Sequence, residues 1–136
     1  MPELQSPQPN PLPPNEWKFA AVVTLVFLAI STLNVAAHVP WRDELRWWQI
    51  ALASPTFAEM RLNMQFEGAP WLWYGLVWLL ARLTTNFFAL QFVHVCFAAA
   101  TVFLFAWRAP FSRFARLLFP FGYFTFFEYA VISRNY

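Results

Sequence analysis

The sequence is poor in the residues from which common catalytic and metal sites are built. Cys96 is its single cysteine, so both an intrachain disulfide and a cysteine-based metal cluster are excluded. The two histidines, His38 and His94, do not stand at the spacing of zinc ligands. Only three glycines occur, and there is no glycine-rich phosphate loop, serine elbow or metalloprotease motif. Chemistry on soluble nucleotides is therefore not expected.

Charge is scarce as well. Charged residues make up 12% of the chain, compared with about a quarter in a typical soluble domain. The net charge of +2 is small and the arginines are scattered, which argues against nucleic acid as a partner. Hydrophobic residues make up 60% of the chain and the mean hydropathy is +0.43. This composition predicts an integral membrane protein whose main partner is the lipid bilayer.

The first 39 residues divide into a polar tail and an apolar run. Residues 1–16 contain Pro2 and five further prolines among polar residues, which predicts a disordered tail. Residues 17–39 include an uncharged stretch long enough to cross about 30 Å of hydrocarbon, so we expect transmembrane helix 1 there. Glu3 and Glu16 oppose a single Lys18 before this run, which favours an uncleaved anchor over a cleaved signal peptide.

The apolar stretch after Gly68 can be divided in two ways. Either residues 69–83 and 87–107 are two spans, or only the second spans while residues 69–81 form a surface helix. Apolar stretches of about 10–14 residues are more often interfacial or re-entrant than spanning. The tryptophans of the shorter stretch also prefer the headgroup level. Both observations favour the surface helix.

Arginine placement tests the same choice independently. Residues 108–116 form the densest basic loop, and short basic loops tend to stay cytoplasmic. With a cytoplasmic N-terminus, the surface-helix division places this loop inside, although four other arginines then lie outside. We therefore predict an all-α integral membrane fold with about three transmembrane helices and juxtamembrane surface helices in the first outer loop. The predicted segments are an outer loop at 40–85, helix 2 at 86–107, helix 3 at 117–132 with kinks at Pro120 and Gly122, and the start of a second outer loop at 133–136.

Two adjacent carboxylates follow the first span. Asp43 and Glu44 lie between Arg42 and Arg46, whose positive charges favour the ionised carboxylate that a general base requires. The alternative is an ordinary helix start, in which the two acids complement the helix dipole. A second acidic position, Glu128, lies near the end of the third apolar run, with Arg134 six residues further on. These two residues are a potential pair, or else two charges at headgroup level.

The order of these parts resembles the N-terminal part of the C-type superfamily of integral-membrane glycosyltransferases, such as protein O-mannosyltransferases and lipid A aminoarabinose transferases. The resemblance is carried by Asp43-Glu44 in the first outer loop, by the stretch 68–74 with Arg82 after it, and by the stretch 133–136. The family often has lysine or histidine before the proline of its second surface helix, where this chain has Ala69. Members normally have many more spans, so this chain resembles a truncated member.

The resemblance implies transfer of a sugar from a polyprenyl-phosphate donor to an acceptor on the outer face. Asp43 takes the position of the base, with Glu44 beside it, and Glu128 is the nearest match to an acidic residue near a metal or the donor phosphate. Arg42, Arg46 and Arg134 are the candidate ligands of that phosphate. A divalent metal is the one cofactor left open.

The resemblance also implies a bacterial inner membrane, and a fragment that is inactive alone. The alternative function is a small non-catalytic helical membrane protein that assembles with partner subunits.

Overall fold

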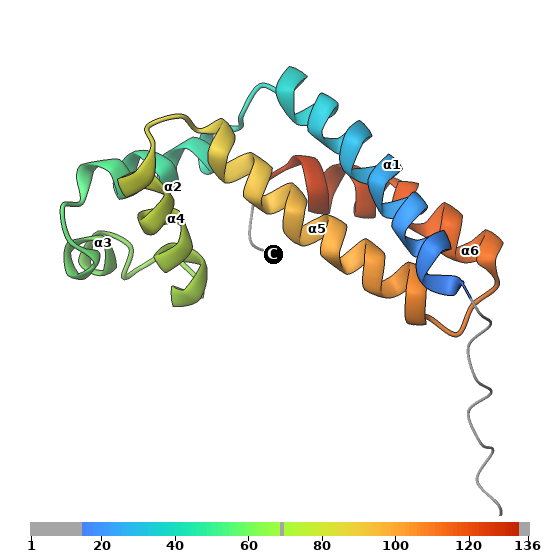
Figure 1. The fold of residues 1–136 in the computed structure, drawn as a ribbon. Helices are drawn as coiled ribbons and strands as arrows, with labels where there is room; N and C mark the ends of the chain where they lie inside the picture. The colour runs from blue at the N-terminus through green and yellow to red at the C-terminus, as the bar shows by residue number, and fades with distance from the viewer. Residues whose placement is uncertain (1–14, 69, 134–136) are drawn as a thin grey trace, which may run out of the picture.

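The computed structural model describes residues 15–68 and 70–133, and every regular element in these two stretches is helical (Figure 1). This confirms the all-α prediction. The elements are α1 (Glu16–Ala37), α2 (Arg42–Ala53), α3 (Phe57–Asn63), α4 (Trp71–Leu83), α5 (Phe88–Arg108), α6 (Arg113–Leu118), the 3-10 turn η1 (Phe119–Phe121) and the π-helix η2 (Phe124–Val131).

Helices α1 and α5 pack side by side in opposite directions along most of their length (Figure 1). Among the described residues they are the two helices that are long and apolar enough to cross a membrane. They correspond to the segments 17–39 and 86–107 expected from the sequence. Their buried residues recur every three or four positions, as one face of a helix requires. The buried faces consist of Ala20, Val23, Phe27, Ser31 and Val35 on α1, and of Gln91, Val95, Ala99, Val102 and Ala106 on α5.

The segment α6–η1–η2 returns along this pair, but it is not one continuous α-helix. The α-helix ends at Leu118, a 3-10 turn contains Pro120, and the chain at Gly122 is extended before η2 begins. Proline has no backbone N–H and clashes with the preceding turn of a helix, which explains the break. The single kinked helix predicted at 117–132 is therefore wrong: α6 begins within the predicted loop 108–116, and the chain breaks fully at the two residues where kinks were expected. Phe27 of α1 packs edge-on against Phe121 and Phe126, which holds the broken segment against the helix pair.

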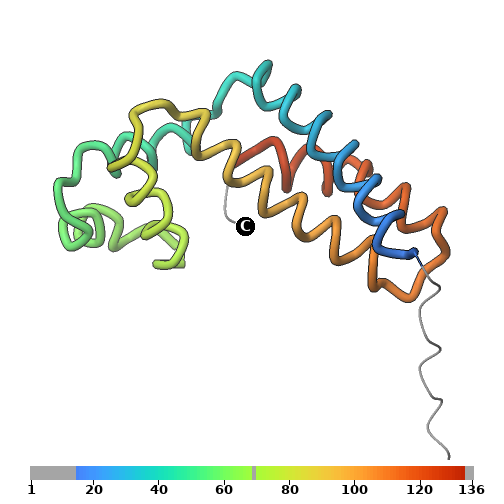
Figure 2. The backbone as a smooth tube through the Cα atoms, viewed as in Figure 1, coloured from blue at the N-terminus to red at the C-terminus, as the bar shows by residue number. Residues whose placement is uncertain are grey.

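Helices α2, α3 and α4 form a separate small core, here called the α2–α4 unit, at one end of the helix pair (Figure 2). Its centre includes Trp48, Met60 and Tyr74, all buried. The guanidinium of Arg82 donates to the carbonyls at the end of α2, at 2.7 Å from the oxygen of Ala51 and 3.1 Å from that of Leu52. Arg82 thus satisfies carbonyls that the helix end leaves without partners.

Helix α4 runs back beside the first half of α5. Its 13 residues extend over only about 20 Å, which is shorter than a hydrocarbon core of about 30 Å. Trp73, Leu80 and Phe87 all pack against the core of the α2–α4 unit, and the Trp73 ring also lies 5.6 Å from the ring of His94, two turns into α5. The N-terminal end of α4 is therefore nearer the middle of α5 than its C-terminal end is. Ala69, the first residue of the expected surface helix 69–81, lies outside the described residues.

Candidate functional site

Glu44 caps the start of α2. It occupies the third position of the helix, and its Oε2 accepts a hydrogen bond from the backbone N–H of Trp41 at 2.8 Å. A glutamate at this position satisfies an N–H that the helix leaves free, and its charge is favourable at the positive end of the helix dipole. The helix start that the sequence offered as the alternative explanation of Asp43 and Glu44 is therefore present.

The same carboxylate joins two other segments. Its Oε2 lies 3.1 Å from Nε2 of His38, which caps the end of α1, and its Oε1 accepts from the backbone N–H of Ser133 at 2.7 Å. Glu44 is fully buried. We call this set of contacts, made by Glu44 with His38, Trp41 and Ser133, the Glu44 clamp. It places the end of α1, the start of α2 and the end of η2 at one point.

The two predicted catalytic acids consequently differ in what they can do. Asp43 is exposed on the first turn of α2, whereas the oxygens of Glu44 already accept from the partners in the clamp. A general base must reach the proton that it removes. Glu44 thus has a structural role at the start of α2, whereas Asp43 is the adjacent acid whose side chain is exposed.

Two of the three arginines predicted to bind the donor phosphate, Arg42 and Arg46, lie among the described residues. Arg42 and Arg46 are exposed and lie one turn apart on α2, so they share a face. Arg46 forms an ion pair of 2.7 Å with Glu67, which a phosphate would have to displace. Arg134 lies outside the described residues. Arg42 is thus the predicted ligand that needs the least rearrangement.

Glu128, the tentative metal ligand, lies on η2. Its Oε1 accepts a hydrogen bond of 3.0 Å from the hydroxyl of Tyr123. Among the residues that the structure describes, no group of three or more histidine, cysteine, aspartate or glutamate side chains is placed to hold a metal ion. Glu128 would therefore need ligands from a substrate or from another part of the protein.

A second buried glutamate, which the sequence analysis did not single out, lies at the opposite end of the helix pair. Glu16 is 2% exposed, and its Oε1 accepts from Nε of Arg113 at 2.9 Å. Its Oε2 lies 2.7 Å from the guanidinium of Arg116, which also donates to the carbonyl of Ala106. We call Glu16, Arg113 and Arg116 the Glu16 cluster. The two arginines, three residues apart in the predicted basic loop, were the only sign of this cluster in the sequence. Their partner Glu16 lies 97 positions before Arg113.

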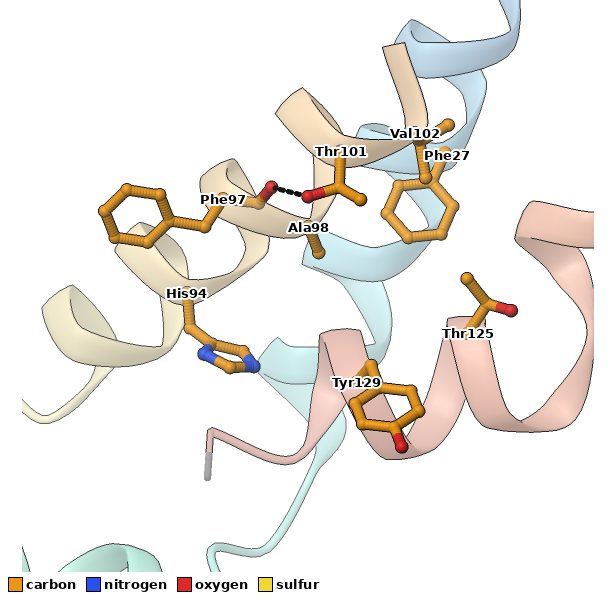
Figure 3. A pocket seen from close by; sticks show the side chains of 8 residues that line it. All are labelled: Phe27, His94, Phe97, Ala98, Thr101, Val102, Thr125 and Tyr129. Atoms are coloured by element: carbon orange, nitrogen blue, oxygen red, sulfur yellow. Dashed lines mark hydrogen bonds between the residues drawn. The ribbon is translucent and has the colours of Figure 1, made fainter. Parts of the chain in front are cut away.

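A pocket of about 350 Å³ opens between α5, η2 and the middle of α1 (Figure 3). Along α5 it extends from His94 to Val102, and Thr125 and Tyr129 of η2 form the opposite side. Most of its lining is apolar. The exceptions include Nε2 of His94, which is buried and has no hydrogen-bond partner among the described residues. Only the three-dimensional arrangement shows this pocket, because its lining comes from three segments of the chain.

No protein-family model, no curated protein and no solved structure matches this chain.

Proposed function

We propose that the chain is an integral membrane protein in which α1, α5 and the segment α6–η2 cross the bilayer. Most residues on the two long helices are not buried: only 28% of the most apolar stretch of each is buried within the chain. A core helix of a soluble protein would be mostly covered, whereas residues such as Leu25 and Leu33 of α1 are 64% and 71% exposed. Lipid is the environment in which such apolar surface is stable.

In this arrangement the two ends of the helix pair lie on opposite sides of the bilayer. The Glu16 cluster and Lys18 make one end basic, which supports its placement in the cytoplasm. The Glu44 clamp, with Asp43 beside it, then lies on the outer side, and η2 brings Glu128 toward the same side. A bacterial inner membrane is the membrane that we propose.

We propose further that the outer end is the acceptor half of a transferase for sugars linked to polyprenyl phosphate. The observation that carries this is the position of the pocket. It begins at His94, about two turns from the start of α5, and extends about 12 Å along α5 toward the middle of the helix. An isoprenoid chain lying there would place its phosphate near Arg42 at the outer end. Asp43 would then remove the proton from the acceptor hydroxyl as the sugar leaves the phosphate.

Photolabelling tests the pocket without requiring activity. The whole chain in lipid vesicles is exposed to a diazirine derivative of polyprenyl phosphate, and the labelled peptides are identified. We expect labels on 94–102 and on η2, and competition by unmodified polyprenyl phosphate. Thr101→Trp fills the pocket and should abolish labelling. Ala100→Trp, on the neighbouring exposed position outside the pocket lining, should leave it intact. Equal labelling of both variants would contradict the proposal.

Asp43→Asn tests the chemistry. Sugar transfer from a polyprenyl-phosphate donor, assayed in membranes that contain the chain, should fall by more than about a hundredfold, as for loss of a general base, while photolabelling stays unchanged. Undiminished transfer would exclude Asp43 as the base and would favour the non-catalytic membrane protein that assembles with partners.

A further inference from the structure

A hollow on the α2–α4 unit is separate from the Glu44 clamp and from the pocket beside α5. It has a volume of about 350 Å³ and lies where the end of α3 meets the start of α4. Ala58, Arg61 and Leu62 of α3 line it together with Gln65, which follows α3, and Trp71 of α4. The guanidinium carbon of Arg61 lies 5.3 Å from the centre of the Trp71 ring, a cation–π distance that holds the arginine at the hollow.

Arg61 has a positive charge that the described residues do not neutralise. It forms no ion pair among them, whereas Arg46, Arg113 and Arg116 each do. Glu59, two residues earlier, is not within ion-pair distance of it. A planar guanidinium that is held in place and lacks a carboxylate is suited to binding a phosphate group. The side-chain amide of Gln65 offers a further donor at the same hollow.

The surroundings of Arg61 are apolar and exposed. Leu62 is 66% exposed, Phe66 is 93% exposed and Leu72 is 88% exposed, and all three belong to the same corner between α3 and α4. The start of α4 lies against α5, because Trp73 contacts His94 and because Leu72 and Trp73 line a hollow together with Phe97, whereas α3 lies farther from α5 (Figure 1). If α5 crosses the bilayer, the start of α4 lies within its outer leaflet, with Arg61 beside it at Trp71. Large apolar side chains beside a basic residue are typical of a membrane-inserted surface.

We infer that this corner is a binding site for an anionic phospholipid, with the lipid phosphate on Arg61 and Gln65 and the acyl chains against Leu62, Phe66 and Leu72. The inference rests on the proposed membrane insertion, but not on sugar transfer. It gives the short helix α4 a function: α4 holds the α2–α4 unit against one leaflet and gives the protein a preference for acidic lipids.

The test uses the whole chain, purified in a neutral detergent and stripped of lipid. Native mass spectrometry then measures retention of phosphatidylglycerol and of phosphatidylcholine from an equimolar mixture. We expect phosphatidylglycerol to be preferred, and Arg61→Gln to lower its affinity about fivefold, the effect of one basic residue near an anionic surface. Lys18→Gln is the matched control. It also removes one positive charge, but from an exposed position at the start of α1, far from the α2–α4 unit. It should keep the preference.

Three results would overturn the inference: no preference in the unmodified chain, an unchanged preference in Arg61→Gln, or an equal loss in Lys18→Gln, which would indicate general attraction by net charge. Glycerol phosphate without acyl chains should not compete at the same concentration, and full competition would exclude the lipid as the specific occupant. Extraction with alkaline carbonate, applied to membranes that contain the Arg61→Gln variant, tests membrane insertion separately from lipid binding. The variant should remain in the membrane, because α1 and α5 are unchanged.

Discussion

The two ends of the α1–α5 pair each contain one buried glutamate, and the partners of the two differ. Glu16 is held by two arginine side chains, Arg113 and Arg116. Glu44 is held by the backbone N–H groups of Trp41 and Ser133 and by the ring of His38. Charged partners neutralise a buried carboxylate, whereas backbone donors satisfy it without adding a full positive charge.

This difference separates the roles of the two ends. The Glu16 cluster contains one negative and two positive groups, so it closes the proposed cytoplasmic end with an excess of positive charge. The Glu44 clamp joins the backbone beside Asp43 to the end of α1 and to Ser133. The proposed cytoplasmic end is thus held by ion pairs between side chains, and the opposite end mainly by hydrogen bonds from backbone groups.

The largest effect is expected at the Glu44 clamp. Glu44→Ala removes the acceptor of the buried Ser133 N–H and of the partly buried Trp41 N–H, and each buried donor left without a partner costs about 1–3 kcal/mol. We expect the free energy of unfolding to fall by about 3 kcal/mol or more, measured by denaturation with sodium dodecyl sulfate. Asp43→Ala is the matched control on the adjacent exposed residue, and it should change stability by less than about 0.5 kcal/mol. Equal stability of the two variants would show that the clamp contributes nothing.

Arg116→Met should have a smaller but clear effect. It removes the buried partner of the Ala106 carbonyl, and a buried acceptor left unsatisfied costs about 1–3 kcal/mol. The side chain of Arg113 is 57% exposed, so Arg113→Met should cost less than about 1 kcal/mol, as is usual for exposed ion pairs. The same denaturation experiment ranks the two. A larger loss for Arg113→Met would contradict the assignment of Arg116 as the buried member of the cluster.

The salt dependence of these stability changes distinguishes the Glu16 cluster from the Glu44 clamp. Exposed ion pairs are screened by salt, whereas buried hydrogen bonds to backbone groups are screened much less. Raising the salt concentration from low to about 0.5 M should shrink the Arg113→Met effect toward zero and leave the Glu44→Ala effect nearly constant. Equal salt dependence would show that the ends are not electrostatically different.

The smallest predicted effect concerns the α2–α4 unit. Gly75 lies within α4, and a Cβ added there would meet the ring of Phe57 at 3.7 Å, an ordinary van der Waals distance. Gly75→Ala should therefore stabilise the protein by up to about 1 kcal/mol, because alanine is the better helix former. Hydrogen exchange of α4 amides measures the effect locally. Faster exchange in the variant would mean that α4 has no room for the methyl group.

Local sequence patterns predicted the parts of this structure that depend on local physics. The long apolar runs predicted α1 and α5, and the shorter apolar run between them predicted α4. Pro120 and Gly122 predicted a kink at the place where the chain breaks before η2. The capping role of Glu44 could also be predicted from the sequence, because Glu44 lies three residues after Trp41. Its bond to Ser133 could not, because the two residues are 89 positions apart and nothing in either stretch specifies the other.

The same limit applies to the rest of the candidate site. Glu16 was counted only as a charge before the first span, since its partners come from α6, far along the chain. The pocket at His94 was not predicted either, because its walls come from three helices and its shape depends on the π-helical turns of η2. The neighbouring arginines did not distinguish Asp43 from Glu44, and the resemblance alone gave Asp43 the position of the base. The burial of Glu44 now separates the two adjacent acids.

The sidedness of the two ends tests the central claim most directly. Cys96 is exposed, so it is replaced by alanine, and single cysteines are introduced at Gln49 on α2 and at Phe111 in the basic loop, both exposed positions. A membrane-impermeant maleimide is applied to spheroplasts and to inverted vesicles. The account predicts that Gln49→Cys is labelled only in spheroplasts and Phe111→Cys only in inverted vesicles. Labelling of both positions from the same side would contradict it.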